Sequence, residues 1–184
     1  MARLFIAVEL PDAVKQSLFS SCREVPGARR VPPDQIHLTL RFLGDVLPET
    51  CVRLKRALAD VEFASFPLTV SGVGHFPPRG HPRVLWAGIE ESRPLLALQQ
   101  QIETAVIEAG IVPEERPFSP HITLARIKEN ASAAVALFEA AHLEQRFPPF
   151  EVTEFILFSS VLTPEGAQHR KETSYPSGCR RHTP

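Results

Sequence analysis

The tetrad His37-Leu38-Thr39-Leu40 recurs in the second half of the chain as His121-Ile122-Thr123-Leu124, and this repeat is the most informative feature of the sequence. In an extended strand successive side chains alternate between two faces, so the His and Thr of each tetrad share one face while the apolar residues point into a core. Two such strands can bring two imidazoles and two hydroxyls to one cleft. Imidazole is suited to proton transfer near neutral pH, and a threonine hydroxyl can hydrogen-bond a phosphate oxygen. The repeat therefore suggests acid–base chemistry at a phosphate.

One tetrad by itself would carry little information. With seven His and nine Thr in 184 residues, about a third of one His-x-Thr is expected by chance, and an ordinary half-buried strand with a solvent-facing His would explain it. Two copies with apolar residues at the same two places are much harder to obtain by accident. The pair therefore favours a functional site over two unrelated strands.

The length and composition indicate a soluble globular protein with a substantial core. The chain has 184 residues, of which 43% are hydrophobic and 22% charged, and its formal net charge is −1. No uninterrupted apolar run approaches the length of a membrane span, and the stretch Met1–Phe5 leads into a predicted strand without a signal-peptide pattern. We therefore expect no membrane association.

The cysteines and the charge balance narrow the class of protein further. Cys22, Cys51 and Cys179 are odd in number, far apart and in no Cys-x-x-Cys pair, so the sequence predicts neither a disulfide framework nor a structural zinc site. This usage fits a reducing cytoplasm. The near-neutral charge argues against a broad non-specific nucleic-acid surface, so any RNA contact has to be local and made by a few arginines.

Periodic apolar residues predict the same order of elements in both halves of the chain. In the first half the pattern predicts strand 3–8, helix 11–22, tetrad strand 36–43, a helix striped by Cys51, Leu54, Leu58 and Val61, and strand 66–73. In the second half it predicts strand 84–89, a helix striped by Leu95, Leu98, Ile102, Val106 and Ala109, tetrad strand 121–127, helix 131–142 and strand 150–160. Each half thus reads strand–helix–tetrad strand–helix–strand.

This repeated order indicates an internal duplication within a single two-lobed domain spanning residues 1–184. We expect α+β lobes over residues 1–76 and 82–166, related by a pseudo-two-fold axis, with the active site between them. The Pro- and Gly-rich stretch Phe76–Pro82 is the expected inter-lobe loop. Residues 174–184 contain few apolar side chains and are expected to fray.

Ordered blocks along the chain are similar to those of a known family. The blocks are Arg3–Pro11, Val31–Gly44, Pro82–Gly88, Arg116–Arg126 and Leu162–Gly166. Together they resemble the RNA 2′,3′-cyclic phosphodiesterases, also called 2′-5′ RNA ligases, of the two-histidine phosphoesterase superfamily. The resemblance covers the chain from about residue 3 to residue 166. Beyond it, the polar stretch Gln168–Thr173 replaces a more apolar closing strand.

The resemblance implies a fold and an activity. The family has a bilobal α+β fold with antiparallel sheets, helices on the outside, and the two tetrads facing each other across a central cleft. Its members hydrolyse a terminal 2′,3′-cyclic phosphate on RNA to a 2′-phosphate without a metal or nucleotide cofactor, and some reversibly join RNA ends through a 2′-5′ linkage. For this chain we accordingly expect a monomeric, cytoplasmic enzyme that binds RNA 3′ ends, including ends derived from tRNA.

The resemblance also implies roles for the residues of the tetrads. Opening a cyclic phosphate needs a deprotonated water on one side of the phosphorus and a protonated leaving oxygen on the other. The family assignment makes His121 the base that activates water and His37 the acid that protonates the 3′-oxygen. Thr39 and Thr123 are expected to hold non-bridging phosphate oxygens. The sequence itself is too symmetric to determine which His is the acid.

Two arginines near the tetrads are candidates for phosphate binding. Arg126 corresponds to the family's phosphate-contacting arginine, five residues after the second His, and strict alternation would place it on the wrong face. A strand end or a β-bulge near Ala125 is therefore required. Arg41, four residues after His37, lies on the catalytic face by alternation and is a second candidate.

Other interpretations remain open at this point. Phe42 and Trp86 could stack on a terminal base, although core packing is the preferred reading for both. The same mechanism could act on small cyclic nucleotides in place of RNA. Alternatively, the chain could be a non-catalytic module that binds RNA ends, but the presence of both His residues favours catalysis.

Overall fold

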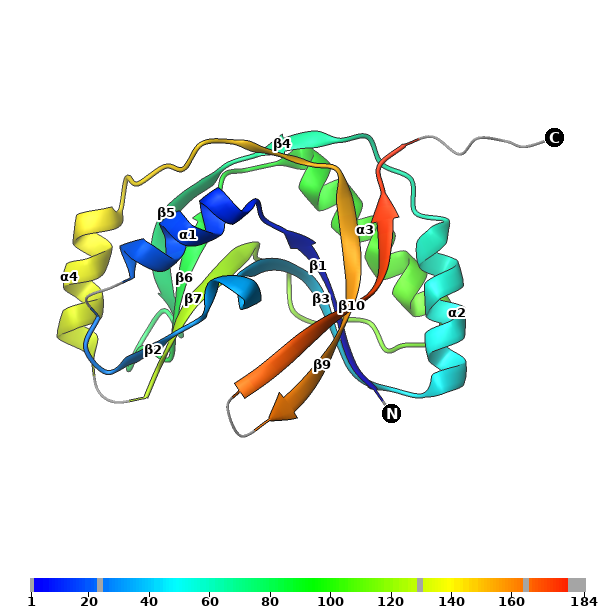
Figure 1. Cartoon of the computed structure of the whole chain (residues 1–184), viewed down its shortest axis with the longest axis horizontal. Coiled ribbons are helices and arrows are strands. Elements are labelled where there is room, and N and C mark those ends of the chain that lie inside the picture. The colour runs from blue at the N-terminus through cyan, green and yellow to red at the C-terminus, as the bar shows by residue number, and fades with distance from the viewer. Residues whose placement is uncertain (1, 23–24, 129–130, 164–165, 179–184) are drawn as a thin grey trace.

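The computed structural model describes residues 2–22, 25–128, 131–163 and 166–178. Its centre is an eight-stranded antiparallel sheet (Figure 1). The strands of this sheet are β1 (Ala2–Glu9), β2 (Ala28–Arg30), β3 (His37–Val46), β5 (Val70–Phe76), β6 (Val84–Ile89), β7 (His121–Ile127), β9 (Glu154–Thr163) and β10 (Gly166–Pro176). Their order is β10-β9-β1-β3-β7-β6-β5, with β2 beside β7. A second, two-stranded sheet pairs β4 (Phe66–Leu68) with β8 (Phe150–Val152).

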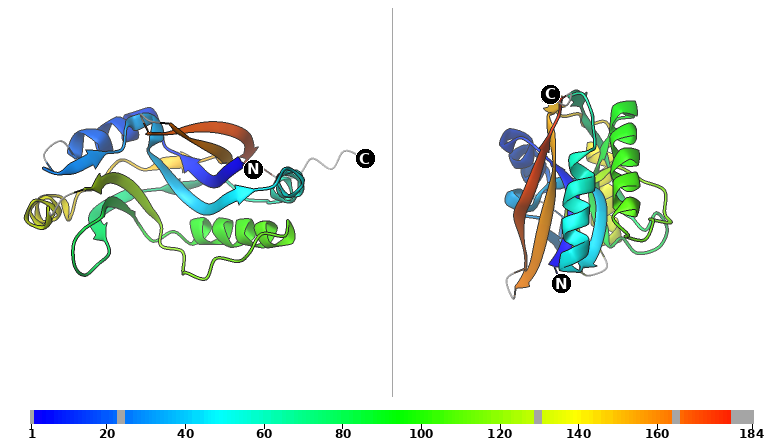
Figure 2. Two further views of the ribbon diagram at one scale, coloured as in Figure 1. Left: turned by 90° about the horizontal axis from the view of Figure 1, so that it is seen from below. Right: turned by 90° about the vertical axis from the view of Figure 1, so that its right-hand side faces the viewer.

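The helices lie towards the two ends of the molecule. They are α1 (Asp12–Ser21), α2 (Pro48–Ala59), α3 (Arg93–Glu108) and α4 (Ser132–His142), with a short 3-10 helix, η1, at Pro33–Gln35. Figure 2 shows α2 and α3 side by side at one end and α4 at the opposite end. The Ser92 hydroxyl accepts a hydrogen bond from the Leu95 N–H and caps α3. The α+β class with antiparallel sheets predicted from the sequence is therefore confirmed.

The two halves of the chain exchange strands within the main sheet. Both halves contain the predicted order of elements as far as the closing strand, β1-α1-β3-α2 and β6-α3-β7-α4. Each closing strand, predicted at 66–73 and 150–160, is divided in the structure between the two sheets, as β4 and β5 in the first half and β8 and β9 in the second. The first half's β5 pairs with β6 of the second half, and the second half's β9 pairs with β1 of the first. The segments 1–76 and 82–166 are thus interleaved in one sheet.

Both tetrad strands contain a β-bulge at the last residue of the tetrad. In β3, Thr39 and Arg41 pair with consecutive residues of β1, which leaves Leu40 as the extra residue. In β7, Thr123 and Ala125 pair with consecutive residues of β6, which leaves Leu124 as the extra residue. A bulge shifts the alternation of all side chains that follow it. The bulge predicted near Ala125 is confirmed, and its counterpart in β3 is an additional finding.

The predicted fraying from residue 174 is wrong for the first residues of that segment. Ser174, Tyr175 and Pro176 belong to β10 and pair with β9. The Tyr175 ring is 7% exposed and stacks on Phe155 with a centroid separation of 4.8 Å. One buried aromatic residue thus anchors a strand that is otherwise polar because it lies at the edge of the sheet. Residues 179–184 lie outside the described part of the chain.

Two of the three cysteines lie in the described part of the chain. Cys22 and Cys51 are free thiols, whereas Cys179 lies outside the described residues. Among the described residues, none of the helices combines the length and apolarity needed to cross a membrane.

Candidate active site

The two tetrad strands meet at a single backbone pairing. Leu38 of β3 pairs with Ile122 of β7 in antiparallel register. This register places His37 across from Thr123, and His121 across from Thr39. Side chains directly opposite each other have Cβ atoms about 4.5–5.5 Å apart, and diagonal ones about 7–8 Å. The two His residues therefore occupy opposite corners of a four-residue square on one face of the sheet.

A pocket of about 420 Å³ opens beside this square. Its lining residues come from six strands and the turn between β2 and β3. They are Arg3, Leu4, Phe5, Arg29, Arg30, Val31, Pro32, Gln35, His37, Thr39, Phe42, Gly44, Thr123, Arg126, Ser160, Ala167 and His169. Three residues of the square thus line the pocket, whereas His121 is outside its lining.

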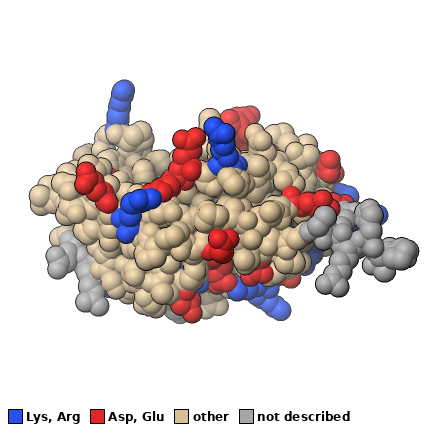
Figure 3. Space-filling model, turned by 90° about the horizontal axis from the view of Figure 1, so that it is seen from above, with Lys and Arg blue, Asp and Glu red and all other residues tan. Residues whose placement is uncertain are grey.

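The pocket differs in charge from the rest of the chain. The whole sequence contains 21 acidic and 20 basic residues, and the face seen in Figure 3 carries side chains of both signs. The lining, in contrast, includes four arginines and two histidines and, within the described part of the chain, no Asp or Glu. A concave surface lined by one sign of charge attracts counter-charged ligands. The charge of this lining therefore favours anionic ligands.

His121 has a defined orientation. Its Nδ1 lies 2.7 Å from the carbonyl oxygen of Ser119. A carbonyl only accepts hydrogen bonds, so this contact assigns the proton to Nδ1 and leaves Nε2 available for proton transfer. The His121 and Phe76 rings are also nearly perpendicular, with a centroid separation of 4.9 Å and an interplanar angle of 80°.

His37 is enclosed by other rings. It stacks on Phe5 at 4.9 Å, and the His169 ring lies 5.3 Å away. Burial, together with the positive charge of protonated His169, lowers the pKa of His37 to about 4, although a backbone hydrogen bond to Gln35 acts in the opposite direction. His37 is therefore neutral at pH 7 in the free protein. A role as proton donor requires a bound anion that raises this pKa.

The bulges determine which side chains after each tetrad reach the pocket. Arg126, five residues after His121, lines the pocket together with Thr123, as expected for a phosphate-binding residue. Its counterpart five residues after His37 is Phe42, which also lines the pocket and is 63% exposed. The core-packing interpretation of Phe42 is therefore wrong.

Trp86, in contrast, packs against the sheet. It is absent from the pocket lining, and its ring lies so close to Gly74 that a Cβ at that position would come within 2.3 Å of it. The Phe76 ring is 5.5 Å away. Packing was the preferred reading for this residue, and the contacts agree with it.

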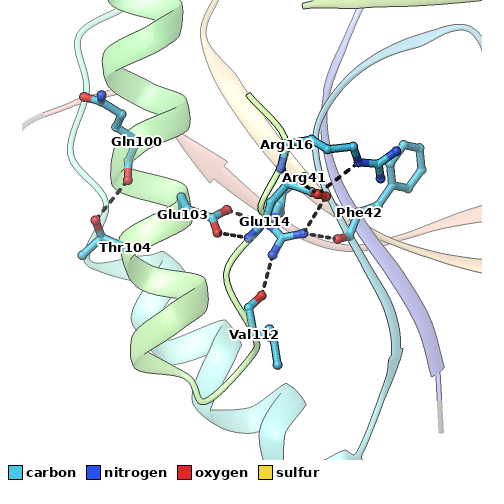
Figure 4. Close-up of polar contacts among 8 residues, drawn as sticks. All are labelled: Arg41, Phe42, Gln100, Glu103, Thr104, Val112, Glu114 and Arg116. Carbon is cyan, nitrogen blue, oxygen red and sulfur yellow. Dashed lines mark hydrogen bonds and ion pairs between the residues drawn. The ribbon is translucent and has the colours of Figure 1, made fainter. Parts of the chain in front are cut away.

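Arg41 does not line the pocket, and its expected position on the catalytic face is wrong. Because Leu40 is bulged, the Arg41 side chain turns toward α3 and is only 8% exposed (Figure 4). Its Nε donates to Glu103 at 2.7 Å and its Nη2 to the Val112 carbonyl at 2.7 Å. Its Nη1 donates to the Phe42 carbonyl at 2.8 Å and pairs with Glu114 at 3.4 Å.

These contacts give Arg41 a structural role. They tie β3 to α3 and to the segment after α3, which leads into the second tetrad. The Glu114 N–H also donates to Glu103 at 2.9 Å, which closes the network. Arg41 therefore holds β3, α3 and the segment after α3 in position relative to one another, and does not itself line the pocket.

Sequence reasoning missed several residues of the pocket wall, including Phe5, Arg29 and His169. None of them lies in a repeated motif. Arg29 reaches the pocket because β2 pairs with β7, and His169 because β10 folds back on β9. Both depend on pairing between distant segments, which local periodicity does not indicate.

Comparison with known proteins identifies the family. The profile of the LigT like Phosphoesterase family matches residues 8–86 and again residues 88–167. The chain is 34% identical over 167 residues to an RNA 2′,3′-cyclic phosphodiesterase of Archaeoglobus fulgidus, covering 89% of this chain and 94% of that protein. It is 37% identical over 183 residues to one of Thermus thermophilus, covering 89% and 84%. The chain therefore belongs to the LigT-like phosphoesterase family.

Solved structures agree with this membership. A crystal structure of E. coli LigT complexed with 3′-AMP matches with a TM-score of 0.78 and 26% identity, covering 96% of this chain and 98% of that one. A crystal structure of a Thermus thermophilus protein matches with a TM-score of 0.75 and 32% identity, covering 95% and 97%. The two matches of the family profile also correspond to the two halves of the chain, in which the same order of elements is repeated.

Proposed function

We propose that this chain hydrolyses the terminal 2′,3′-cyclic phosphate of RNA to a 2′-phosphate. The observation that carries the proposal is the antiparallel pairing of the two tetrads at Leu38 and Ile122, whose register sets His37 opposite Thr123 and His121 opposite Thr39. The curated relatives that carry the name RNA 2′,3′-cyclic phosphodiesterase support the same reaction. The proposal includes two lobes related by a pseudo-two-fold axis, with the substrate between them.

In the proposed reaction, water attacks phosphorus and the bond to the 3′-oxygen breaks. His121 accepts the proton of the attacking water, and His37 delivers a proton to the departing 3′-oxygen, so that the 2′-ester remains. Thr39, Thr123 and Arg126 stabilise the charge that builds on the non-bridging oxygens. If the 5′-hydroxyl of a second RNA replaces water, the same steps form a 2′-5′ linkage.

This assignment requires a change in His37 on binding. In the free protein the pKa of His37 is lowered to about 4. A cyclic phosphodiester is negatively charged, and an anion next to an imidazole favours its protonated form. We propose that substrate binding raises this pKa and thereby produces the proton donor only when it is needed.

The test is incubation with a short RNA that carries a 2′,3′-cyclic phosphate, in the presence of a metal chelator. We expect wild type to yield the 2′-phosphate, and His37→Ala and His121→Ala each to abolish turnover while RNA binding survives. If wild type binds the RNA and never opens the ring, the chain is an RNA-end-binding module. Adenosine 2′,3′-cyclic phosphate and a 5′-hydroxyl RNA added in parallel measure activity on small nucleotides and ligation.

A further inference from the structure

We propose that the rings of Phe76 and Trp86 form a second subsite, which stacks the first base of an RNA whose 5′-hydroxyl attacks the cyclic phosphate. The inference rests on the function proposed above and gives the second substrate of its joining reaction a place on the protein. Neither ring belongs to the pocket described above.

The two sides of the tetrad square are built differently. On one side lies the pocket, whose walls come from β1, β2, β3, β7, β9, β10 and the turn between β2 and β3. Within the described part of the chain, no residue of β5 or β6 contributes to these walls. On the other side β6 pairs with β7, and β5 pairs with β6. The square therefore has the pocket on one side and the strands β6 and β5 on the other.

The aromatic pair lies on the catalytic face of these two strands. Trp86 is directly opposite Thr123, and Gly74 is directly opposite Trp86, so all three share one face of the sheet. The indole covers Gly74, where a Cβ would come within 2.3 Å of the ring. Phe76 lies 5.5 Å from Trp86 and 4.9 Å from His121 between ring centroids, and both aromatic rings are only half-buried. An aromatic surface thus extends outward from His121.

The direction of the reaction brings the attacking group to this side. In an in-line displacement the attacking and leaving oxygens lie on opposite sides of phosphorus. His121 accepts the proton of the attacking group, which therefore enters beside Phe76. When that group is a 5′-hydroxyl, its oxygen bonds to phosphorus and gives its proton to His121. The bond to the 3′-oxygen breaks, and this oxygen takes a proton from His37.

A nucleotide suits this surface in both shape and charge. Unpaired bases stack on aromatic side chains, and the loop that follows Phe76 can meet the phosphates that come after the first base. Residues 77–83 include the exposed Arg79 and Arg83 and contain no Asp or Glu. The Arg83 N–H donates to the Phe76 carbonyl at 2.7 Å and closes this loop next to the ring. The combination favours RNA over an uncharged apolar ligand.

The test varies only the first base of the attacking RNA. Short oligonucleotides with a 5′-hydroxyl and adenine, uracil or an abasic ribose at the first position are joined to an RNA that ends in a 2′,3′-cyclic phosphate. We expect the adenine oligonucleotide to half-saturate wild type at an about tenfold lower concentration than the abasic one, with uracil between them. In Trp86→Leu this ratio should fall below about twofold, and Trp86→Phe should keep most of it.

The control is Phe63→Leu, which replaces another half-buried aromatic ring. Phe63 packs against Phe66 and Phe155 outside the pocket, so this variant should keep the tenfold ratio. Each protein is compared with itself on two oligonucleotides, so a general loss of stability cannot imitate the result. An unchanged ratio in Trp86→Leu, or a wild type that does not distinguish adenine from the abasic ribose, would overturn the inference.

Fluorescence provides a readout besides turnover, because Trp86 is the single tryptophan of the chain. With an RNA 2′-phosphate in saturating amount, the adenine oligonucleotide should quench the emission and the abasic one should not. Quenching by the RNA 2′-phosphate alone, with none added by the oligonucleotide, would place the other base on Trp86 and contradict the proposal. If wild type joins no RNA ends, or opens no ring at all, this titration still decides for or against the subsite. The second of these results alone also ends the proposed function.

Discussion

The two tetrad strands start alike and then differ in the residues that surround them. In both, the His and Thr share one face and a bulge follows at the last tetrad residue. In β3 the next two side chains are a buried Arg41 and an exposed Phe42, whereas β7 has a buried Ala125 and an exposed Arg126. The repeat thus supplies the geometry of the site, while the residues around it make the two halves unequal.

The same inequality applies to the two imidazoles. His37 lies between aromatic and imidazole rings in the pocket wall. His121 instead packs nearly perpendicular to Phe76, and its Nδ1 is hydrogen-bonded to a backbone carbonyl. Under the proposed mechanism, these different neighbours would allow two residues in equivalent positions of a repeat to perform opposite proton transfers.

The largest expected effect is the loss of either imidazole. His37→Asn and His121→Asn should each lower kcat on a cyclic phosphate about 10²–10⁴-fold, because each removes one proton transfer. A phosphodiester with a nitrophenol leaving group needs no protonation of that group. On it, His37→Asn should recover most of its activity, and His121→Asn should not. Recovery in His121→Asn alone would reverse the assigned roles.

Substitutions of the two arginines that follow the tetrads should have different effects: loss of Arg41 should lower stability, and loss of Arg126 should lower activity. Arg41→Met should lower the free energy of unfolding by about 3 kcal/mol, because Glu103 and Glu114 then lose their partner in a largely buried network. Arg126→Met should change unfolding by less than about 0.5 kcal/mol and lower kcat about 10²-fold. Urea unfolding and steady-state kinetics of both variants check this, and equal unfolding energies would contradict the bracing role of Arg41.

The smallest expected effect is the dependence of stability on pH. The folded pKa of His37 is about 4, below its ordinary value of 6.5, so between these values the unfolded chain binds more protons than the folded one. Stability therefore increases with pH across this window, and His37 accounts for a loss of about 2 kcal/mol between pH 7 and pH 5. Urea unfolding at both pH values should show a smaller loss for His37→Asn. An identical loss in both proteins would contradict the lowered pKa.

Much of the site could be predicted from residue patterns because its central part is local. The tetrads and the repeated order of elements follow from alternation and spacing. The bulge near Ala125 follows from the family resemblance, which places Arg126 at the phosphate although alternation alone would turn it away. The prediction for Arg41 failed because alternation was continued through Leu40, where the structure has the counterpart of the bulge at Leu124. Applied to both copies, the same argument would have removed Arg41 from the pocket and placed Phe42 there.

Other features could not be predicted because they depend on distant pairing. His169 and Arg29 reach the pocket only through the register of β10 on β9 and of β2 on β7. The end of β10 was also unpredictable from composition, since a single buried ring, that of Tyr175, holds it.

The exchange of β5 and β9 between the halves has a consequence for any half-length fragment. Cut at the proline-rich loop, the first fragment would present β1 without its neighbour β9, and the second would present β6 without β5. Each fragment would also contain only one of the two tetrads. The two fragments could restore the strand pairing of the main sheet and bring the two tetrads together only by associating with each other, as a heterodimer in which each fragment supplies half of the proposed site.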